Sequence, residues 1–138
     1  MSERILVVDD DRPTADMQAL LIGTLGYEAK AVYSGQDAVD LIPTYEPDMA
    51  LIDIGMPVRD GYDTVASIRR QPGGTHVILV AVTGWSRDED KRKAYESGFD
   101  LHVTKPMRED TLRDLLALLD PEGDSTSPAE IDPDENAS

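Results

Sequence analysis

The chain contains no cysteine, few basic residues and no long apolar run. Without cysteine it has no disulfide bonds, no thiolate metal ligands and no cysteine nucleophile. No stretch reaches the roughly 20 apolar residues that a membrane-spanning helix needs, so we expect no membrane partner. Lysine and arginine number 13 against 28 aspartates and glutamates, which gives a net charge of −15. We expect no direct binding to nucleic acid, because phosphate backbones attract basic surfaces.

The length of 138 residues suits one domain with a short extension. Residues 121–138 consist mainly of Pro, Ser, Asp and Glu, with Ile131 as their only large apolar residue. This composition predicts a domain at 1–120 followed by an acidic, disordered tail or linker. The first apolar run starts too close to Met1 to leave room for a signal peptide, so we expect a cytoplasmic location.

Short apolar runs alternate with helical patterns along the domain. The runs Ile5–Val8, Met49–Ile52 and Val77–Val82 are continuously apolar, which is typical of strands buried on both faces. Glu28–Tyr33 and Leu101–Val103 are weaker strand candidates that suit outer positions. Five strands that alternate with five helices predict an α/β fold with a doubly wound parallel sheet.

The helical segments have their own start and stop signals. Pro13 fits the first turn of a helix that ends at Gly26, and Ser34 can cap the next helix, which Pro43 should end early or kink. A third helix spans about 62–70. The apolar positions at helical spacing in the first, second and last helices are Met17, Leu20, Leu21 and Leu25; Ala38, Val39, Leu41 and Ile42; and Leu112, Leu115, Leu116 and Leu119.

The helix near 87–97 differs from the others because it is mostly charged. Ala94 and Tyr95 are its only obvious anchors to a core. We therefore expect this helix to have the weakest packing of the set.

Polar side chains follow the predicted strands where each one ends. Asp9, Asp10 and Asp11 follow the first strand, and Asp53 ends the third. Thr83 follows the fourth strand and Lys105 the fifth, close after Thr104. In open parallel sheets, ligands bind beyond the carboxyl ends of the strands, so we expect these groups to converge on one edge.

Converging carboxylates repel each other, and a bound cation relieves that repulsion. Oxygen ligands without histidine or cysteine suit Mg²⁺, with Mn²⁺ as a substitute. A lysine and a hydroxyl could receive the other oxygens of a phosphoryl group, and one carboxylate could form an acyl phosphate. No glycine-rich phosphate loop is present, so a nucleotide is not the evident donor.

Four motifs occur in order at these predicted strand ends: VVDD at 7–10, DIGMPVRDG at 53–61, AVTG at 81–84 and TKP at 104–106. With them, residues 3–119 resemble the receiver domain of two-component response regulators. The resemblance implies the flavodoxin-like (βα)5 fold with strand order 2-1-3-4-5.

The resemblance also implies a role for each matching residue. Asp53 matches the phosphoacceptor, and Lys105 and Thr83 match the phosphate-binding lysine and the switch hydroxyl. The metal ligands would be Asp9, Asp10, Asp53 and the backbone carbonyl of Gly55. His102 stands where the family often has Tyr or Phe, and would take part in switching. Trp85 and Met56 would lie at the rim of the site, and the Lys105–Pro106 peptide bond would be cis.

Simpler interpretations of the same residues remain open. Asp9 and Asp10 could cap the first helix, a role we favour for Asp11 alone. Asp53 could be a turn aspartate and Thr83 a strand-end threonine bonded to its own loop. The lysine at 105 could be a solvated surface charge, His102 a partly exposed strand residue and Trp85 a loop residue that covers the core.

A receiver would accept a phosphoryl group from a histidine kinase or a histidine phosphotransfer protein and would not act as an enzyme on other substrates. It would signal through the face formed by the helix near 87–97, the strand at 101–103 and the last helix, or pass the phosphoryl group on. One alternative is a receiver segment of a longer hybrid kinase or multidomain regulator; Met1 mildly favours a stand-alone protein. Another is a Mg²⁺-dependent phosphatase with an aspartate nucleophile, but Gly55 occupies the place of its acid/base aspartate.

Overall fold

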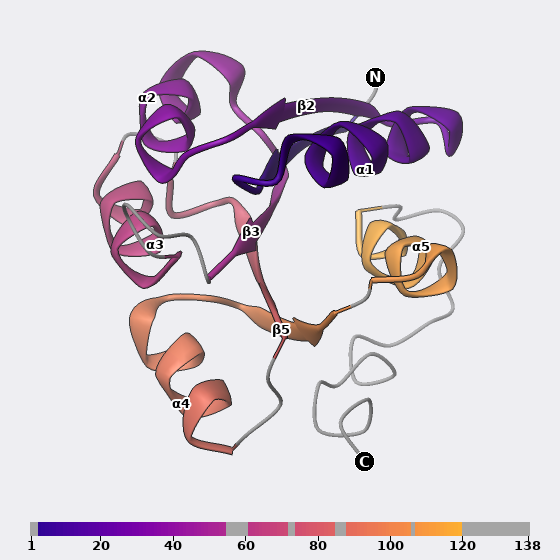
Figure 1. Cartoon of the computed structure of the whole chain (residues 1–138). Helices are drawn as coiled ribbons and strands as arrows, with labels where there is room; N and C mark the ends of the chain where they lie inside the picture. The colour runs from indigo at the N-terminus through magenta and orange to yellow at the C-terminus, as the bar shows by residue number, and fades with distance from the viewer. Residues whose placement is uncertain (1–2, 55–60, 72–73, 85–87, 106, 120–138) are drawn as a thin grey trace.

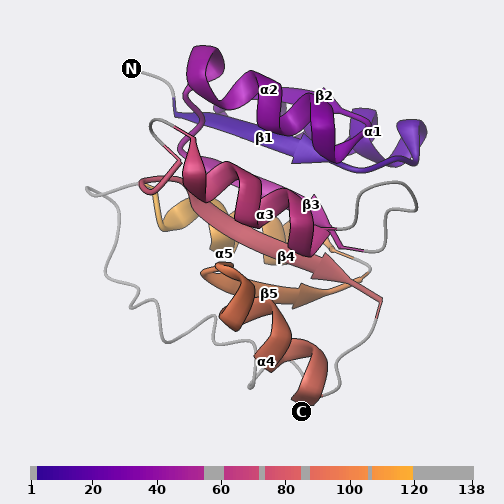
Figure 2. The same ribbon diagram turned by 90° about the vertical axis from the view of Figure 1, so that its left-hand side faces the viewer.

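The computed structural model describes residues 3–54, 61–71, 74–84, 88–105 and 107–119. Its five strands form one sheet in the order β2-β1-β3-β4-β5, with every neighbouring pair parallel. Figure 2 shows the strand arrows pointing the same way. The predicted fold class and strand order are therefore confirmed. The strands are β1 (Arg4–Val8), β2 (Glu28–Val32), β3 (Met49–Asp53), β4 (Ile78–Thr83) and β5 (Leu101–Thr104).

The position of each strand follows from its composition. β3 is buried along its whole length, and β1 and β4 are buried except at their first residues. Their apolar side chains can serve both faces of a sheet that is covered on both sides. β2 and β5 are less buried and lie at the two edges, as their weaker apolar patterns predicted.

The register of the sheet aligns the carboxyl ends of its strands. Val8 pairs with Ile52, and Asp53 pairs with Val82 on the next strand. Thr83 in turn pairs with Thr104. The residues that follow these pairs therefore emerge at one edge of the sheet.

Helix α1 (Arg12–Thr24) begins and ends where the sequence predicted. Pro13 lies in its first turn, and Gly26 follows with a φ of +98°, a conformation that glycine adopts without strain. Its apolar pattern is only partly buried, since Met17 and Leu20 are 69% and 71% exposed. Helical spacing shows that residues share a face, but it does not determine how far that face extends over the sheet.

Helix α2 (Gly35–Tyr45) begins at its predicted cap, because the Ser34 hydroxyl accepts a hydrogen bond from the amide of Asp37. Pro43 does not end this helix early, because the helix continues to Tyr45. The alternative expectation, that Pro43 kinks the helix, stays a prediction. Only the last turn follows the proline, and the amide of Glu46 closes that turn by donating to the Ile42 carbonyl. The cost of the missing proline N–H is therefore confined to the helix end.

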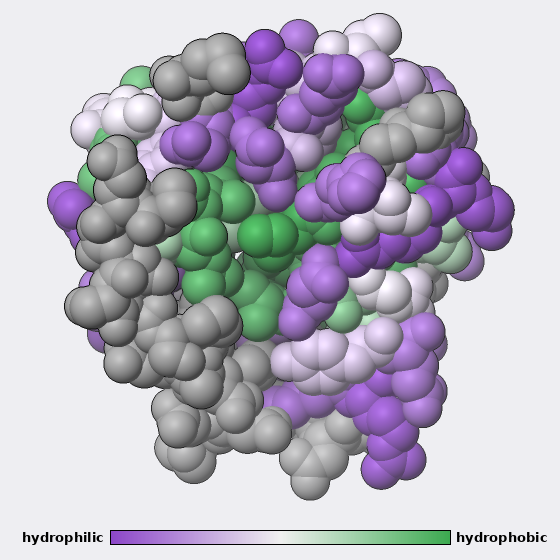
Figure 3. Space-filling model, turned by 180° about the vertical axis from the view of Figure 1, so that it is seen from behind, coloured by the Kyte–Doolittle hydropathy of each residue, from purple (hydrophilic) through white to green (hydrophobic). Residues whose placement is uncertain are grey.

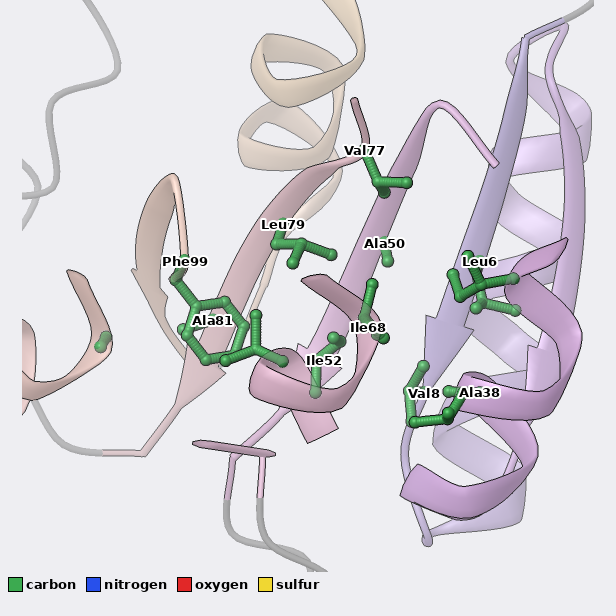
Figure 4. Packing of buried hydrophobic residues seen from close by; sticks show 14 residues of the cluster. Leu6, Val8, Ala38, Ala50, Ile52, Ile68, Val77, Leu79, Ala81 and Phe99 are labelled. Atoms are coloured by element: carbon green, nitrogen blue, oxygen red, sulfur yellow. The ribbon is translucent and has the colours of Figure 1, made fainter. Parts of the chain in front are cut away.

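The remaining helices are α3 (Gly61–Arg70), α4 (Asp88–Ser97) and α5 (Glu109–Ala117). In α4, Ala94 is buried as predicted, but the prediction for Tyr95 is wrong because this residue is 41% exposed. Its place is taken by Phe99, which follows the helix and is 4% exposed. Figure 4 shows the Phe99 ring beside Ala81 of the sheet.

The sheet has two covered faces, named here by their helices (Figure 1). The α1–α5 face and the α2–α3–α4 face each have an apolar cluster because side chains alternate along the strands. On the α1–α5 face the cluster contains Ile5, Val7, Ala15, Ile22, Met49, Leu51, Val80, Val82, Val103, Leu112, Leu115 and Leu116. On the α2–α3–α4 face (Figure 4) it contains Leu6, Val8, Ala38, Val39, Ile42, Ala50, Ile52, Val65, Ile68, Val77, Leu79, Ala81, Ala94 and Phe99.

The clusters are not fully covered everywhere. Half-buried residues such as Leu41, Leu101 and Leu119 pack at their margins. Figure 3 accordingly shows hydrophobic surface near the middle of the rear face, bordered by hydrophilic residues. Among the described helices, none has the length and apolar character needed to cross a bilayer.

Candidate functional site

Asp9 lies directly after β1 and is only 4% exposed. One of its carboxylate oxygens accepts a hydrogen bond of 2.9 Å from the backbone amide of Asp11. Burial raises the pKa of Asp9, and the neighbouring Asp53 carboxylate adds to that effect, while the Asp11 amide and Lys105 oppose it. The sequence thus places a destabilised carboxylate at the end of a buried strand.

Asp53 ends β3 and is 8% exposed. The Nζ atom of Lys105 lies 3.0 Å from its Oδ2 atom, an ion pair between residues 52 positions apart. Lys105 is held from its backbone too, since its amide donates to the Thr83 carbonyl at 2.6 Å. Lys105 is therefore not a lone charge, although its side chain remains 40% exposed to solvent.

Three carboxylates meet at this edge of the sheet. Asp9, Asp10 and Asp53 can each offer an oxygen, and these oxygens lie within 4.8 Å of one another. Asp9 and Asp53 are buried, whereas Asp10 is exposed. An all-oxygen set with one solvent-facing member fits Mg²⁺, which prefers oxygen ligands and retains several waters. The residues present therefore suit the predicted metal.

Asp11 has a different role from its two neighbours. Its carboxylate accepts hydrogen bonds from the amide and the hydroxyl of Thr14, in the first turn of α1. The prediction that Asp11 caps this helix is confirmed. Three consecutive aspartates thus divide into two that can serve the carboxylate site and one that starts a helix.

Thr83 lies on β4, next to the carboxylate-bearing β3, and His102 lies one strand further, on β5. Thr83 is the last residue of β4 and is 3% exposed. His102 is 1% exposed, so the interpretation of a partly exposed strand histidine is wrong. Because it alternates with Leu101 and Val103 of the α1–α5 face, His102 points to the opposite face, where α4 packs against β5.

Some predicted features lie outside the described residues. These are Gly55, Met56, Trp85, the Lys105–Pro106 peptide bond and the tail at 121–138. Their roles stay predictions.

A groove next to Lys105 was not predicted. It has a volume of about 590 Å³ and lies between α1 and the segment that follows β5. Met17 and Leu21 recur at helical spacing, and their contribution to an open surface could not be read from that pattern. The lining residues are Pro13, Thr14, Met17, Gln18, Leu21, Lys105 and Met107.

A doubly wound parallel sheet in the order 2-1-3-4-5, with an acidic pocket at the carboxyl ends of its strands, defines the flavodoxin-like receiver fold. The family model described as response regulator receiver domain matches residues 5–117, and the chain belongs to this family.

Several solved structures are similar to this chain. A receiver domain from Methylobacillus flagellatus is 30% identical, with a TM-score of 0.78, and the match covers 86% of this chain and 99% of that one. The receiver domain of a sensor histidine kinase from Pseudomonas aeruginosa PAO1 is 27% identical, with a TM-score of 0.77 and coverage of 86% and 97%. Its description places a magnesium ion in its active-site cleft. A chemotaxis protein of Vibrio cholerae, 24% identical with a TM-score of 0.81 and coverage of 86% and 98%, bears on the fold alone.

Membership of the family gives the function in outline. Receiver domains of two-component systems act in phosphoacceptor signalling, bind Mg²⁺ at an acidic pocket, and interact with histidine kinases or phosphotransfer proteins.

Proposed function

We propose that Asp53 accepts a phosphoryl group from a phosphohistidine of a kinase or phosphotransfer protein and that this modification is the signal. The observation that carries the proposal is the ion pair of 3.0 Å between Lys105 and Asp53, beside two further carboxylates. A buried aspartate with a cation on one side and carboxylates on the other has the surroundings that an aspartyl nucleophile needs.

The transfer forms one bond and breaks one. An oxygen of Asp53 attacks phosphorus, the phosphorus–nitrogen bond of the phosphohistidine breaks, and the released imidazole keeps the bonding electrons and takes up a proton. When bound by Asp9, Asp10, Asp53 and the Gly55 carbonyl, Mg²⁺ would neutralise charge on the phosphoryl oxygens. The Lys105 amine can move from the carboxylate to a phosphoryl oxygen, and the Thr83 hydroxyl can donate to another.

We further propose that the output is a change in protein contacts. Thr83 and His102 lie on adjacent strands, and His102 is buried beneath helices that the phosphorylation site can influence through Thr83. A shift of the Thr83 hydroxyl toward the phosphoryl group would change the packing of α4 on β5. The α4–β5–α5 surface would then present a different shape to a downstream protein.

The groove between α1 and Lys105 supports a protein as the phosphodonor. It opens next to the amine that pairs with Asp53, and it is lined mainly by apolar groups. On the same helix, Leu20 is 71% exposed. A donor protein that covers this groove would bring its phosphohistidine to the acceptor and exclude water. Met17→Asp should therefore slow transfer from a phosphotransfer protein without slowing phosphorylation by a small donor.

Intact-mass measurement after incubation with Mg²⁺ and a small phosphodonor tests the acceptor. We expect the chain to gain one phosphoryl group, Asp53→Asn to gain none, and the exposed-site control Asp37→Asn to behave as the unchanged chain. Lys105→Met should be phosphorylated roughly 10²-fold more slowly, the loss expected when one charge-stabilising group is removed. Phosphorylation that persists in Asp53→Asn would refute the assignment.

We also propose that the domain promotes only its own phosphorylation and dephosphorylation. An unrelated phosphomonoester should not act as a donor, so the chain should release no phosphate from it above the rate of the ester alone. Sustained turnover would instead favour the phosphatase alternative.

A further inference from the structure

Arg69, in the last turn of α3, joins three separate segments of the chain. Its guanidinium group reaches the turn that precedes β4 and the turn between α4 and β5. It also forms an ion pair of 2.8 Å with Asp100, and its side chain is 22% exposed. In Figure 2, α3 and α4 lie in front of β4 and β5, so this contact spans the space between two helix–strand units.

Arg69 has an acceptor for each of its five N–H donors. The Nε and Nη2 atoms donate to the Gly98 carbonyl at 3.0 and 2.7 Å, and Nη2 also donates to Asp100. The Nη1 atom donates to the carbonyls of Gly74 and Val77 at 3.0 and 2.9 Å. A planar group with all donors engaged fixes the relative positions of its acceptors.

Two glycines allow the backbone to come this close. Gly98 has a φ of +120°, which side chains with a Cβ atom rarely adopt. At Gly74, a Cβ atom would lie 1.8 Å from the Ile68 carbonyl oxygen, so no other residue fits there without movement of the backbone. The acceptors of Arg69 are therefore presented by backbone that the sequence has adapted to this contact.

Asp100 connects this contact to the sheet. The same Oδ2 atom that pairs with Arg69 accepts a hydrogen bond of 2.8 Å from the Leu79 amide. In return, the Asp100 amide donates to the Leu79 carbonyl at 2.8 Å. Asp100 is thus fixed to one residue of β4 by two hydrogen bonds, immediately before β5 begins.

The register of β5 depends on its buried side chains and on a short ladder of pairs with β4. It is an edge strand of four residues, bonded to β4 on one side only. A slip of one residue would turn every side chain of a strand to the opposite face. In the observed register, Thr83 pairs with Thr104, and Lys105 follows at the acceptor. Lys105 comes five residues after Asp100, roughly 16 Å along an extended strand.

We propose that Arg69 and Asp100 are positioning residues of the phosphoryl-acceptor site: together they set the register of β5 on β4 and thereby place the Lys105 amine against Asp53. This proposal rests on the proposed role of Lys105 at the acceptor. Neither residue touches the reacting atoms. Their contacts lie at the amino ends of β4 and β5, whereas the site lies at the carboxyl ends of these strands.

The proposal predicts a selective loss. Asp100→Ala and Arg69→Gln should slow phosphorylation by a small donor roughly 10- to 100-fold, the range expected when a reacting group is displaced by about 1 Å. Mg²⁺ affinity, measured by calorimetry, should remain within about twofold of the unchanged chain, because the carboxylates lie on β1 and β3 and only their charged neighbour moves. Asp100→Asn keeps an oxygen for the Leu79 amide and should show an intermediate rate.

A matched control distinguishes the loss of this particular ion pair from a change in charge. Glu109→Gln removes the exposed Glu109–Arg113 pair on α5 and changes the net charge by the same amount as Asp100→Asn. It should leave the rate unchanged. All rates are measured where circular dichroism shows each variant to be folded, so that a loss of rate is not a loss of folded protein.

A double substitution tests whether Asp100 acts through Lys105. If it does, Lys105→Met with Asp100→Ala should be no slower than Lys105→Met alone. A further tenfold loss in the double variant, or Mg²⁺ affinity that falls in parallel with the rate, would overturn the proposal. Unchanged rates in both Asp100→Ala and Arg69→Gln would do so as well.

Hydrogen exchange separates this proposal from the proposed function. The Lys105 amide donates to the Thr83 carbonyl, so its exchange reports on the register directly. In Asp100→Ala the amides of 101–105 should exchange faster, while those of β1 and β3 should not. If the unchanged chain accepts no phosphoryl group, the proposed function fails, and exchange at 101–105 still decides whether Asp100 sets the register of β5.

Discussion

The two faces of the sheet are built from different kinds of buried side chain. Within the described residues, the α1–α5 face has an apolar cluster, and the buried polar residues on its side of the sheet are Asp9 and Asp53, at the carboxyl ends of β1 and β3. The α2–α3–α4 face also has an apolar cluster, but buried polar residues lie on the strands and helices of this side. These residues are Thr64, Thr83, Lys91 and His102.

This difference suggests a division of tasks. An apolar cluster is stabilised by close packing, so almost any rearrangement of it makes the folded state less stable. Buried polar groups can exchange one hydrogen-bond partner for another, which gives a packed region two discrete arrangements. We therefore expect the α1–α5 face to carry stability and the α2–α3–α4 face, near β4 and β5, to carry the conformational response.

The largest effect should come from the apolar face. Leu115 on α5 is 1% exposed, and Leu115→Ala should lower the free energy of unfolding by about 2–5 kcal/mol, because it removes buried methyl groups and leaves a cavity. Urea denaturation measures this loss. Below the transition, the hydrogen-exchange response of α4 to beryllofluoride, which mimics a phosphoryl group, should remain unchanged.

Leu20→Ala is the matched control, since Leu20 is 71% exposed on α1. Its free energy of unfolding should change by no more than about 0.5 kcal/mol. A small effect of Leu115→Ala, or an altered α4 response in that variant, would contradict the assignment of stability to this face.

Most of the sheet could be predicted from the sequence, because a short and continuously apolar run must be buried on both faces, and a central strand of a parallel sheet provides that burial. The helices were less predictable in detail. Spacing identified Met17, Leu20 and Tyr95 as members of helices, but their exposure depends on where each helix sits on the sheet. Pro43 was misjudged because its position near a helix end lowers the cost of the missing hydrogen bond.

The candidate site was predictable where a charged side chain lies at the carboxyl end of a predicted strand, as with Asp9, Asp53 and Lys105. The ion pair of Arg69 with Asp100 was not predicted, because 31 residues separate its members and no local pattern marks either of them. The groove beside Lys105 was missed for a related reason: it forms between elements that only the folded chain brings together.

The next largest effect concerns the carboxylates at the carboxyl ends of β1 and β3. Burial raises the pKa of Asp9, so its ionised form at pH 7 destabilises the folded state. In metal-free buffer at this pH, Asp9→Asn should therefore raise the melting temperature. With Mg²⁺ at a hundred times its dissociation constant, the unchanged chain should gain about 2.7 kcal/mol, and Asp9→Asn should gain much less.

Calorimetric melting with and without Mg²⁺ provides this comparison. Asp37→Asn on α2 serves as the control for the lost charge and should respond to Mg²⁺ as the unchanged chain does. Equal Mg²⁺ stabilisation of Asp9→Asn would remove Asp9 from the ligand set.

Substitution of His102 should have a smaller effect on stability. Its effect on the hydrogen-exchange response of α4 to beryllofluoride should be larger. His102→Phe keeps a planar ring at a position that is 1% exposed, so the free energy of unfolding should change by less than about 1.5 kcal/mol. A phenyl ring cannot exchange hydrogen-bond partners, and the exchange response of α4 to beryllofluoride should weaken. A full response in this variant would mean that His102 only fills space.

The smallest effect should arise at the margin of the α2–α3–α4 face, where Tyr45 packs against the apolar cluster. Burial, with Glu28 nearby, raises the pKa of Tyr45 to about 12, against about 10 in the unfolded chain. Because the folded-state pKa is the higher one, the neutral phenol stabilises the protein below pH 10, and that contribution is lost between pH 10 and 12.

Two pKa units correspond to about 2.7 kcal/mol, and solvent screening at this half-exposed position reduces the expected contribution to about 1 kcal/mol. Tyr45→Phe carries no titrating group, so its stability relative to the unchanged chain should rise by that amount between pH 9 and pH 12. Other tyrosines and lysines titrate in both proteins and cancel in the difference. Urea denaturation at the two pH values measures it, and an unchanged difference would show that the Tyr45 hydroxyl is as well solvated in the folded chain as in the unfolded one.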